Sequence, residues 1–106
     1  MKRFEVYSGT TLVGWSDLEG VDRAMATAYG TLAVADGYAR IRSAAIDLRG
    51  VSQGELDLSV RLTGSGRLQC DFIHIADHSD DAAVDGVEVS AHGISAPRVD
   101  DLFPRA

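Results

Sequence analysis

The chain of 106 residues contains one cysteine, Cys70, and two prolines. A single cysteine excludes an internal disulfide framework and a zinc site built from paired cysteines. No apolar run approaches the roughly 20 residues that a membrane-spanning helix needs, and the sequence shows no signal peptide. These absences predict a soluble, cytoplasmic protein that does not bind membranes.

Basic residues are also scarce, since Lys2 and nine arginines face sixteen acidic residues, with a net charge of −6. Nucleic-acid binding usually requires a basic stripe, so we expect no nucleic-acid partner. The imbalance lies in the second half, where residues 54–106 hold four arginines and ten carboxylates. That half is either a solvated acidic surface or a docking surface for a basic protein.

What is present is an ordinary globular composition, with 45% hydrophobic and 25% charged residues. These values match folded domains and differ from disordered chains, which combine low hydrophobicity with high net charge. The length suits one domain, so we expect residues 1–106 to form a single globular unit.

Alternation of apolar and polar residues predicts most of the strands. Residues 56–62 show it most clearly, and the turn Gly64-Ser65-Gly66 predicts a hairpin between this strand and a return strand over residues 68–75. The apolar residues of the return strand change from even to odd positions at Phe72-Ile73. This change of parity indicates a bulge or burial on both faces. The other predicted strands cover residues 2–8, 11–16, 25–34 and 87–91.

In residues 37–48 the apolar residues instead recur with helical spacing. Asp36 is the candidate N-cap of this helix, and Gly50 is the candidate residue that ends it. This segment predicts one main helix, with Arg40 and Arg42 on its solvent face. Residues 96–103 predict a short helix after Pro97. The predicted fold is therefore α+β: about six mostly antiparallel strands, one main helix packed on the sheet, and a short C-terminal helix.

Oxygen-bearing side chains from Asp77 to Glu88 partly follow a calcium-loop spacing. The pattern lacks glycine at its sixth position, which is Ala82, and its flanks predict strands where such a loop needs helices. We therefore expect an acidic hairpin loop, no metal site and no cofactor.

Histidines supply the other candidate chemistry. His74, Asp77 and His78 form a histidine–carboxylate cluster, which His92 could join across paired strands. Cys70 shares the apolar parity of its strand, which predicts an inert core thiol. The cluster supports an alternative hypothesis, a small enzyme with its site at these residues, while no complete catalytic motif is recognisable.

The main hypothesis is a non-catalytic protein-interaction module, with an acidic second half that fits a basic protein partner. Its candidate partner-binding residues are Trp15, Asp80, Asp81 and Asp85. Trp15 is either an interface anchor or a core residue. Size and charge are similar to those of immunity proteins that neutralise basic toxins, which is an analogy and not a motif.

Both ends of the chain resemble small bacterial proteins of unknown function. The residues that carry the resemblance are Phe4-Glu5-Val6, Leu12-Val13-Gly14-Trp15-Ser16-Asp17-Leu18-Glu19, Met25, Gly86-Val87-Glu88-Val89, Gly93-Ile94 and Leu102-Phe103-Pro104. Where those proteins usually have Gly-Asp-Pro-Pro, this chain has Gly20-Val21-Asp22-Arg23-Ala24. The resemblance implies a bacterial cytoplasmic origin and assigns no functional residue.

Overall fold

Two antiparallel sheets of four strands each make up most of the protein, in a computed structural model that describes residues 3–48, 50–79 and 86–104. The strand order is β5-β2-β1-β6 in the first sheet and β3-β4-β8-β7 in the second. The predicted α+β class is therefore wrong: within these residues the fold is mostly β, and neither α-helix exceeds six residues.

The first sheet is built on the N-terminal hairpin. β1 (Phe4–Ser8) and β2 (Thr11–Ser16) pair through a turn at Gly9, whose positive φ of 59° suits glycine. β6 (Leu58–Leu62) pairs with the other side of β1, and β5 (Ala33–Val34) pairs with the outer side of β2. The first predicted hairpin is thus confirmed.

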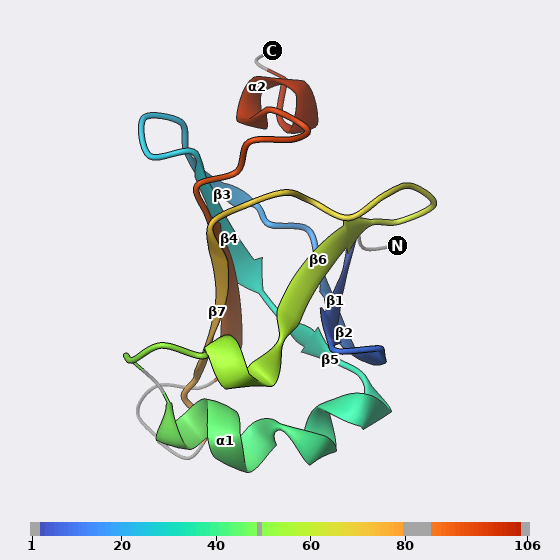
Figure 1. Cartoon of the computed structure of the whole chain (residues 1–106), viewed down its shortest axis with the longest axis vertical. Coiled ribbons are helices and arrows are strands. Elements are labelled where there is room, and N and C mark those ends of the chain that lie inside the picture. Colours follow the sequence, from blue (N-terminus) through green and yellow to red (C-terminus); the bar gives the residue numbers. More distant parts are fainter. Residues whose placement is uncertain (1–2, 49, 80–85, 105–106) are drawn as a thin grey trace.

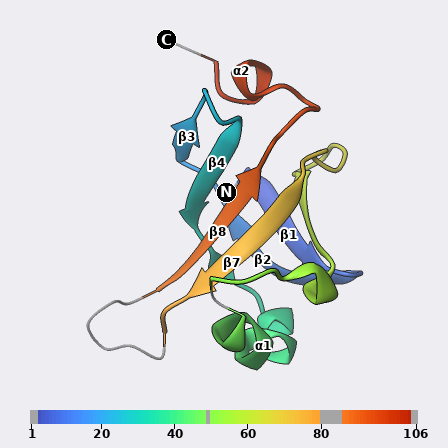
Figure 2. The same cartoon turned by 60° about the vertical axis from the view of Figure 1, so that its left-hand side comes forward.

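The second sheet places β8 (Val87–His92) between β4 (Thr27–Thr31) and β7 (Phe72–Asp77), and β3 (Gly20–Asp22) forms its other edge. β4 leads through one residue, Leu32, into β5, so one stretch of chain belongs to both sheets. On the opposite side the sheets separate, since β6 and β7 are edge strands of different sheets. The sheets thus wrap around a common core and part along one seam (Figures 1 and 2).

Alternate residues of the strands point into this core, as the period of two requires. Short helices cover its two ends: a 3₁₀ turn (Asp36–Arg40) and α1 (Arg42–Asp47) at one, and α2 (Val99–Leu102) at the other (Figure 1). The largest fully buried apolar side chains are Phe4, Leu18, Ile75, Val6, Val13, Val60 and Val89.

The predicted helix over residues 37–48 is interrupted. Ile41, with φ −113° and ψ −3°, separates the 3₁₀ turn from α1. The N-cap position is Ala35, so Asp36 lies inside the turn and is not its cap. The apolar spacing fits a helix, but residues 36–40 turn more tightly, and Gly37 there packs so closely on the Leu12 carbonyl that a Cβ would lie 2.4 Å from the oxygen. Arg40 and Arg42 are exposed, as predicted.

The predicted hairpin between residues 56–62 and 68–75 forms only next to its turn, where Arg61 and Arg67 make an isolated antiparallel bridge, and residues 72–75 pair with another strand. The chain turns at residues 64–66, and Leu68 donates a backbone hydrogen bond to Val60 at 2.8 Å. It then crosses to the other sheet, where β7 pairs with β8. Leu56 lies in a second 3₁₀ turn (Gly54–Leu56) and is not part of the strand.

A buried polar pair ties the helical end of the molecule to β7. The Tyr38 hydroxyl donates a 2.5 Å hydrogen bond to Asp77, and Asp77 also accepts bonds from the backbone amide and hydroxyl of Ser79. Asp77 has no exposed surface. Burial alone would raise the pKa of its carboxyl, but the bonds from Ser79 and Tyr38 outweigh burial and lower it.

We predict that Tyr38→Phe lowers the free energy of unfolding by about 1.5–3 kcal/mol, the usual contribution of a hydrogen bond to a charged group. Urea unfolding at neutral pH measures the change. Tyr29→Phe is the matched control, because Tyr29 is 44% exposed, and should change the free energy by less than about 0.5 kcal/mol. An effect of Tyr38→Phe no larger than that of the control would contradict the assigned bond.

The same pair predicts an acid dependence of stability. Because the pKa of Asp77 is lower when folded, its stabilisation is complete above the unfolded pKa, about 3.9, and is lost as pH falls through the folded value. The stability difference between wild type and Tyr38→Phe should therefore narrow when urea unfolding is repeated below about pH 4. A difference that is constant from neutral to acid pH would show that Asp77 is not the ionised acceptor.

Candidate functional site

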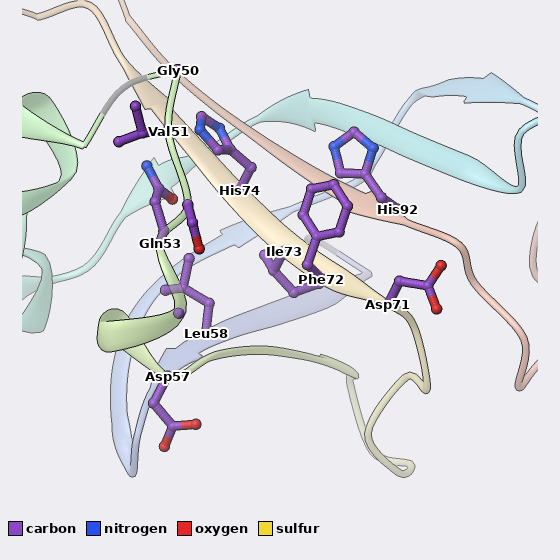
Figure 3. A pocket seen from close by; sticks show the side chains of 12 residues that line it. Gly50, Val51, Gln53, Asp57, Leu58, Asp71, Phe72, Ile73, His74 and His92 are labelled. Atoms are coloured by element: carbon purple, nitrogen blue, oxygen red, sulfur yellow. The ribbon is translucent and has the colours of Figure 1, made fainter.

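A cleft of about 730 Å³ lies on the seam between β6 and β7. Its apolar lining comes from Leu58 of β6 and from Phe72 and Ile73 of β7, and its rim includes Val51 and Gln53 from the segment after α1 (Figure 3). A second hollow of about 580 Å³ shares Leu58, Phe72 and Ile73 and continues along the same edge. The two hollows make one groove along the outer edge of β7.

Gln53 covers part of that edge. Its side-chain amide donates to the carbonyl of Ile75 at 2.7 Å, and its side-chain oxygen accepts from the Ile75 amide, also at 2.7 Å. The side chain thus satisfies both outward backbone groups of Ile75, as a neighbouring strand would. Gln53 itself is buried.

Two residues earlier on β7, Ile73 has the same orientation. The backbone amide and carbonyl groups of alternate residues point to the same side of a strand, so the amide and carbonyl of Ile73 also point away from β8. No hydrogen bond from the described part of the chain reaches them on that side. The edge of β7 is therefore covered at Ile75 and open at Ile73, where the cleft lies.

Aromatic rings flank this opening. Phe72 is 55% exposed and stacks on His92 with ring centroids 4.3 Å apart. His74 follows on the same face of β7 and lines the same cleft. Burial, reinforced by the nearby His92, lowers the pKa of His74 despite a hydrogen bond with the Val51 backbone, so His74 is uncharged at neutral pH.

Two carboxylates line the cleft. Asp57 and Asp71 are both exposed, and no described residue of the cleft lining is an arginine or lysine, while Arg67 lines the adjoining hollow. Asp57 adopts a left-handed conformation with φ 49°, which aspartate tolerates better than most residues, and its carbonyl accepts a bond from the Gly9 amide. The cleft thus combines apolar walls, an open strand edge and two carboxylates.

The histidine–carboxylate cluster does not form one site. His74 faces the cleft, whereas Asp77 points to the opposite face of β7 and binds Tyr38. His78 lies beyond the end of β7 and does not line the cleft, while His92 does. Among residues 3–48, 50–79 and 86–104, no group of three or more His, Cys, Asp or Glu side chains is arranged to hold a metal ion.

The predicted partner-binding residues have different outcomes. Trp15 is partly exposed on the outer face of the first sheet, where it pairs with Glu5 and Ala33, and it is not part of the core. Asp80, Asp81 and Asp85 lie outside the described residues. The Cys70 thiol is half-buried against the core, and burial raises its pKa.

Sequence reasoning missed the residues that define the cleft. The role of Gln53 could not be predicted from its sequence neighbours, because it binds Ile75, which lies 22 positions away in the chain. The parity change at Phe72-Ile73 predicted a bulge or burial on both faces, and this was wrong: β7 pairs with β8 in continuous register, with Phe72 exposed and Ile73 buried. Leu58 belonged to a predicted apolar face, and its position at the seam between the two sheets makes it a wall of the cleft.

No protein-family model matches the chain, and comparisons with curated proteins and with solved structures also find no match. Separately, no helix in the described ranges is long and apolar enough to cross a membrane.

We predict that Gln53→Ala lowers the free energy of unfolding by about 1–3 kcal/mol, because it leaves buried backbone groups of Ile75 without partners. Gln53→Glu should also destabilise, since a carboxylate cannot donate to the Ile75 carbonyl. Urea unfolding measures both changes. Gln69→Ala is the control, because Gln69 is exposed and uses only its backbone in bonding. Equal effects of Gln53→Ala and the control would rule out the assigned bonds.

Proposed function

We propose that the protein is a non-catalytic interaction module that binds a basic segment of a partner protein in the cleft between β6 and β7. The observation that carries the proposal is an open, apolar cleft whose charged lining residues are the carboxylates of Asp57 and Asp71. Immunity proteins that neutralise basic toxins are one class of such modules.

Two properties of the cleft and the charge balance of the chain support a protein partner. Exposed aromatic residues such as Phe72 are typical anchors of protein interfaces. Carboxylates at the rim of an apolar site attract a basic partner and set its orientation more than they add affinity. Residues 54–106 also hold ten carboxylates and four arginines, a charge balance that favours a basic partner.

The alternative, an enzyme built on His74, Asp77 and His78, receives less support from the geometry. General acid–base catalysis needs groups within hydrogen-bond reach of one reacting centre. His74 and Asp77 point to opposite faces of β7, and the Asp77 carboxylate already accepts bonds from Tyr38 and Ser79. We therefore favour binding over catalysis.

The proposal predicts that the double variant Asp57→Asn/Asp71→Asn binds the partner about two- to thirtyfold more weakly at low salt, because exposed ion pairs contribute about 0.2–1 kcal/mol each. The partner is captured from native bacterial lysate on the immobilised protein, identified, and then titrated in purified form. The difference between wild type and variant should shrink as salt is raised.

Asp47→Asn is the matched control, because Asp47 is exposed on α1 and does not line the cleft. It removes one negative charge and should leave the affinity within about twofold, since distant surface charges are largely screened. A captured protein that binds wild type and the Asp57/Asp71 variant with equal affinity would contradict the proposed site.

A further inference from the structure

We propose that the partner segment binds as an added β-strand on the open edge of β7, pairing with the backbone of Ile73. This inference rests on the proposed function and specifies the mode of binding. The bound chain is an extended segment of a basic protein, since the cleft offers a strand edge and two carboxylates.

The backbone of β7 provides the first argument. Ile73 and Ile75 present their outward amide and carbonyl groups to the same side, and at Ile75 both groups are held by Gln53 at 2.7 Å. A strand added at Ile73 would form the same two bonds that Gln53 forms at Ile75: one donor to the backbone carbonyl and one acceptor for the backbone amide. An unpaired edge readily adds a strand, and at Ile73 the edge opens on the cleft.

The neighbours of Ile73 limit the length of the added strand. Gln53 blocks the edge at Ile75, and at the other end the amide of Asp71 is turned inward, bonded to the His92 carbonyl at 2.8 Å. A partner strand would therefore make its two backbone hydrogen bonds around Ile73 and leave the edge on either side. Short pairing of this kind requires side-chain contacts for affinity.

The walls of the cleft supply those contacts. Side chains of an added strand alternate between two faces. The side chain opposite Ile73 would meet Leu58 on the core side, and the next one would meet Phe72 and His74 on the outer face (Figure 3). Basic side chains would reach Asp57 or Asp71 at the rim. The predicted motif thus alternates apolar and other residues and includes arginine or lysine.

A display library of random ten-residue peptides, panned on the folded full chain, tests this proposal. Phe72→Arg serves for counter-selection, because it adds a positive charge at an exposed position in the cleft. Val34→Arg is the matched control: Val34 is 51% exposed on β5 and does not line the cleft. Selected peptides should bind wild type and Val34→Arg equally and lose at least about tenfold in affinity for Phe72→Arg.

The best peptide is then synthesised with one N-methylated amide at each position in turn. Methylation removes a backbone donor and adds a clash, so binding should fall by at least about tenfold where the amide faces Ile73. At the flanking positions on either side of it, whose amides point away from β7, the loss should stay below about threefold.

The outcomes separate the two proposals. Binding that requires the open cleft but tolerates N-methylation at every position overturns strand addition and leaves the interaction module in place. Failure to select any peptide that discriminates wild type from Phe72→Arg overturns both proposals. Circular dichroism and urea unfolding confirm that both variants are folded before they are compared.

Discussion

The two hydrogen bonds between Gln53 and Ile75 determine what the edge of β7 can do. A sheet edge exposes a row of donors and acceptors, and native proteins usually cover or interrupt such rows. Here a single buried amide covers one position by imitating a peptide group. These bonds hold Gln53 beside β7 at Ile75. The segment of residues 51–54 does not cover the strand edge at Ile73, where the cleft lies.

The seam itself follows from how the chain connects the two sheets. β4 and β5 form one nearly continuous stretch that joins the sheets on one side, while β6 and β7 diverge on the other. The ends of the core are covered by short helices, and Tyr38 anchors one of them to Asp77. At this seam the apolar walls of the cleft remain accessible.

The period-two patterns predicted most strands well, since alternation reflects which side chains are buried. Residues 58–62 and 87–91 are strands as expected. Alternation does not show which strands are neighbours in a sheet, so the hairpin after residue 62 was correct only next to its turn, and the rest of its return strand pairs with β8. In residues 37–48 the helical spacing did not give one continuous helix: residues 36–40 form a 3₁₀ turn, in which Gly37 packs closely on the Leu12 carbonyl.

The candidate site was harder to predict because it consists of relations between distant residues. The sequence predicted a cluster of His74, Asp77 and His78, but the pleat of β7 places His74 and Asp77 on opposite faces of the strand. Gln53, Leu58 and Ile73 look ordinary in the sequence and gain their roles from the unpaired seam. The parity change at Phe72-Ile73 lies at the start of β7, but it predicted a bulge or burial on both faces, which β7 does not show there.

The central claim is that Ile73 presents a free strand edge beside an occupied one at Ile75. Amide hydrogen exchange, resolved by residue in the free protein, tests it most directly. The account predicts that the Ile73 amide exchanges at least about tenfold faster than the Ile75 amide, because one hydrogen bond of about 1.4 kcal/mol corresponds to that factor. Equal, strong protection of both amides would show that the edge at Ile73 is already paired and would contradict the account.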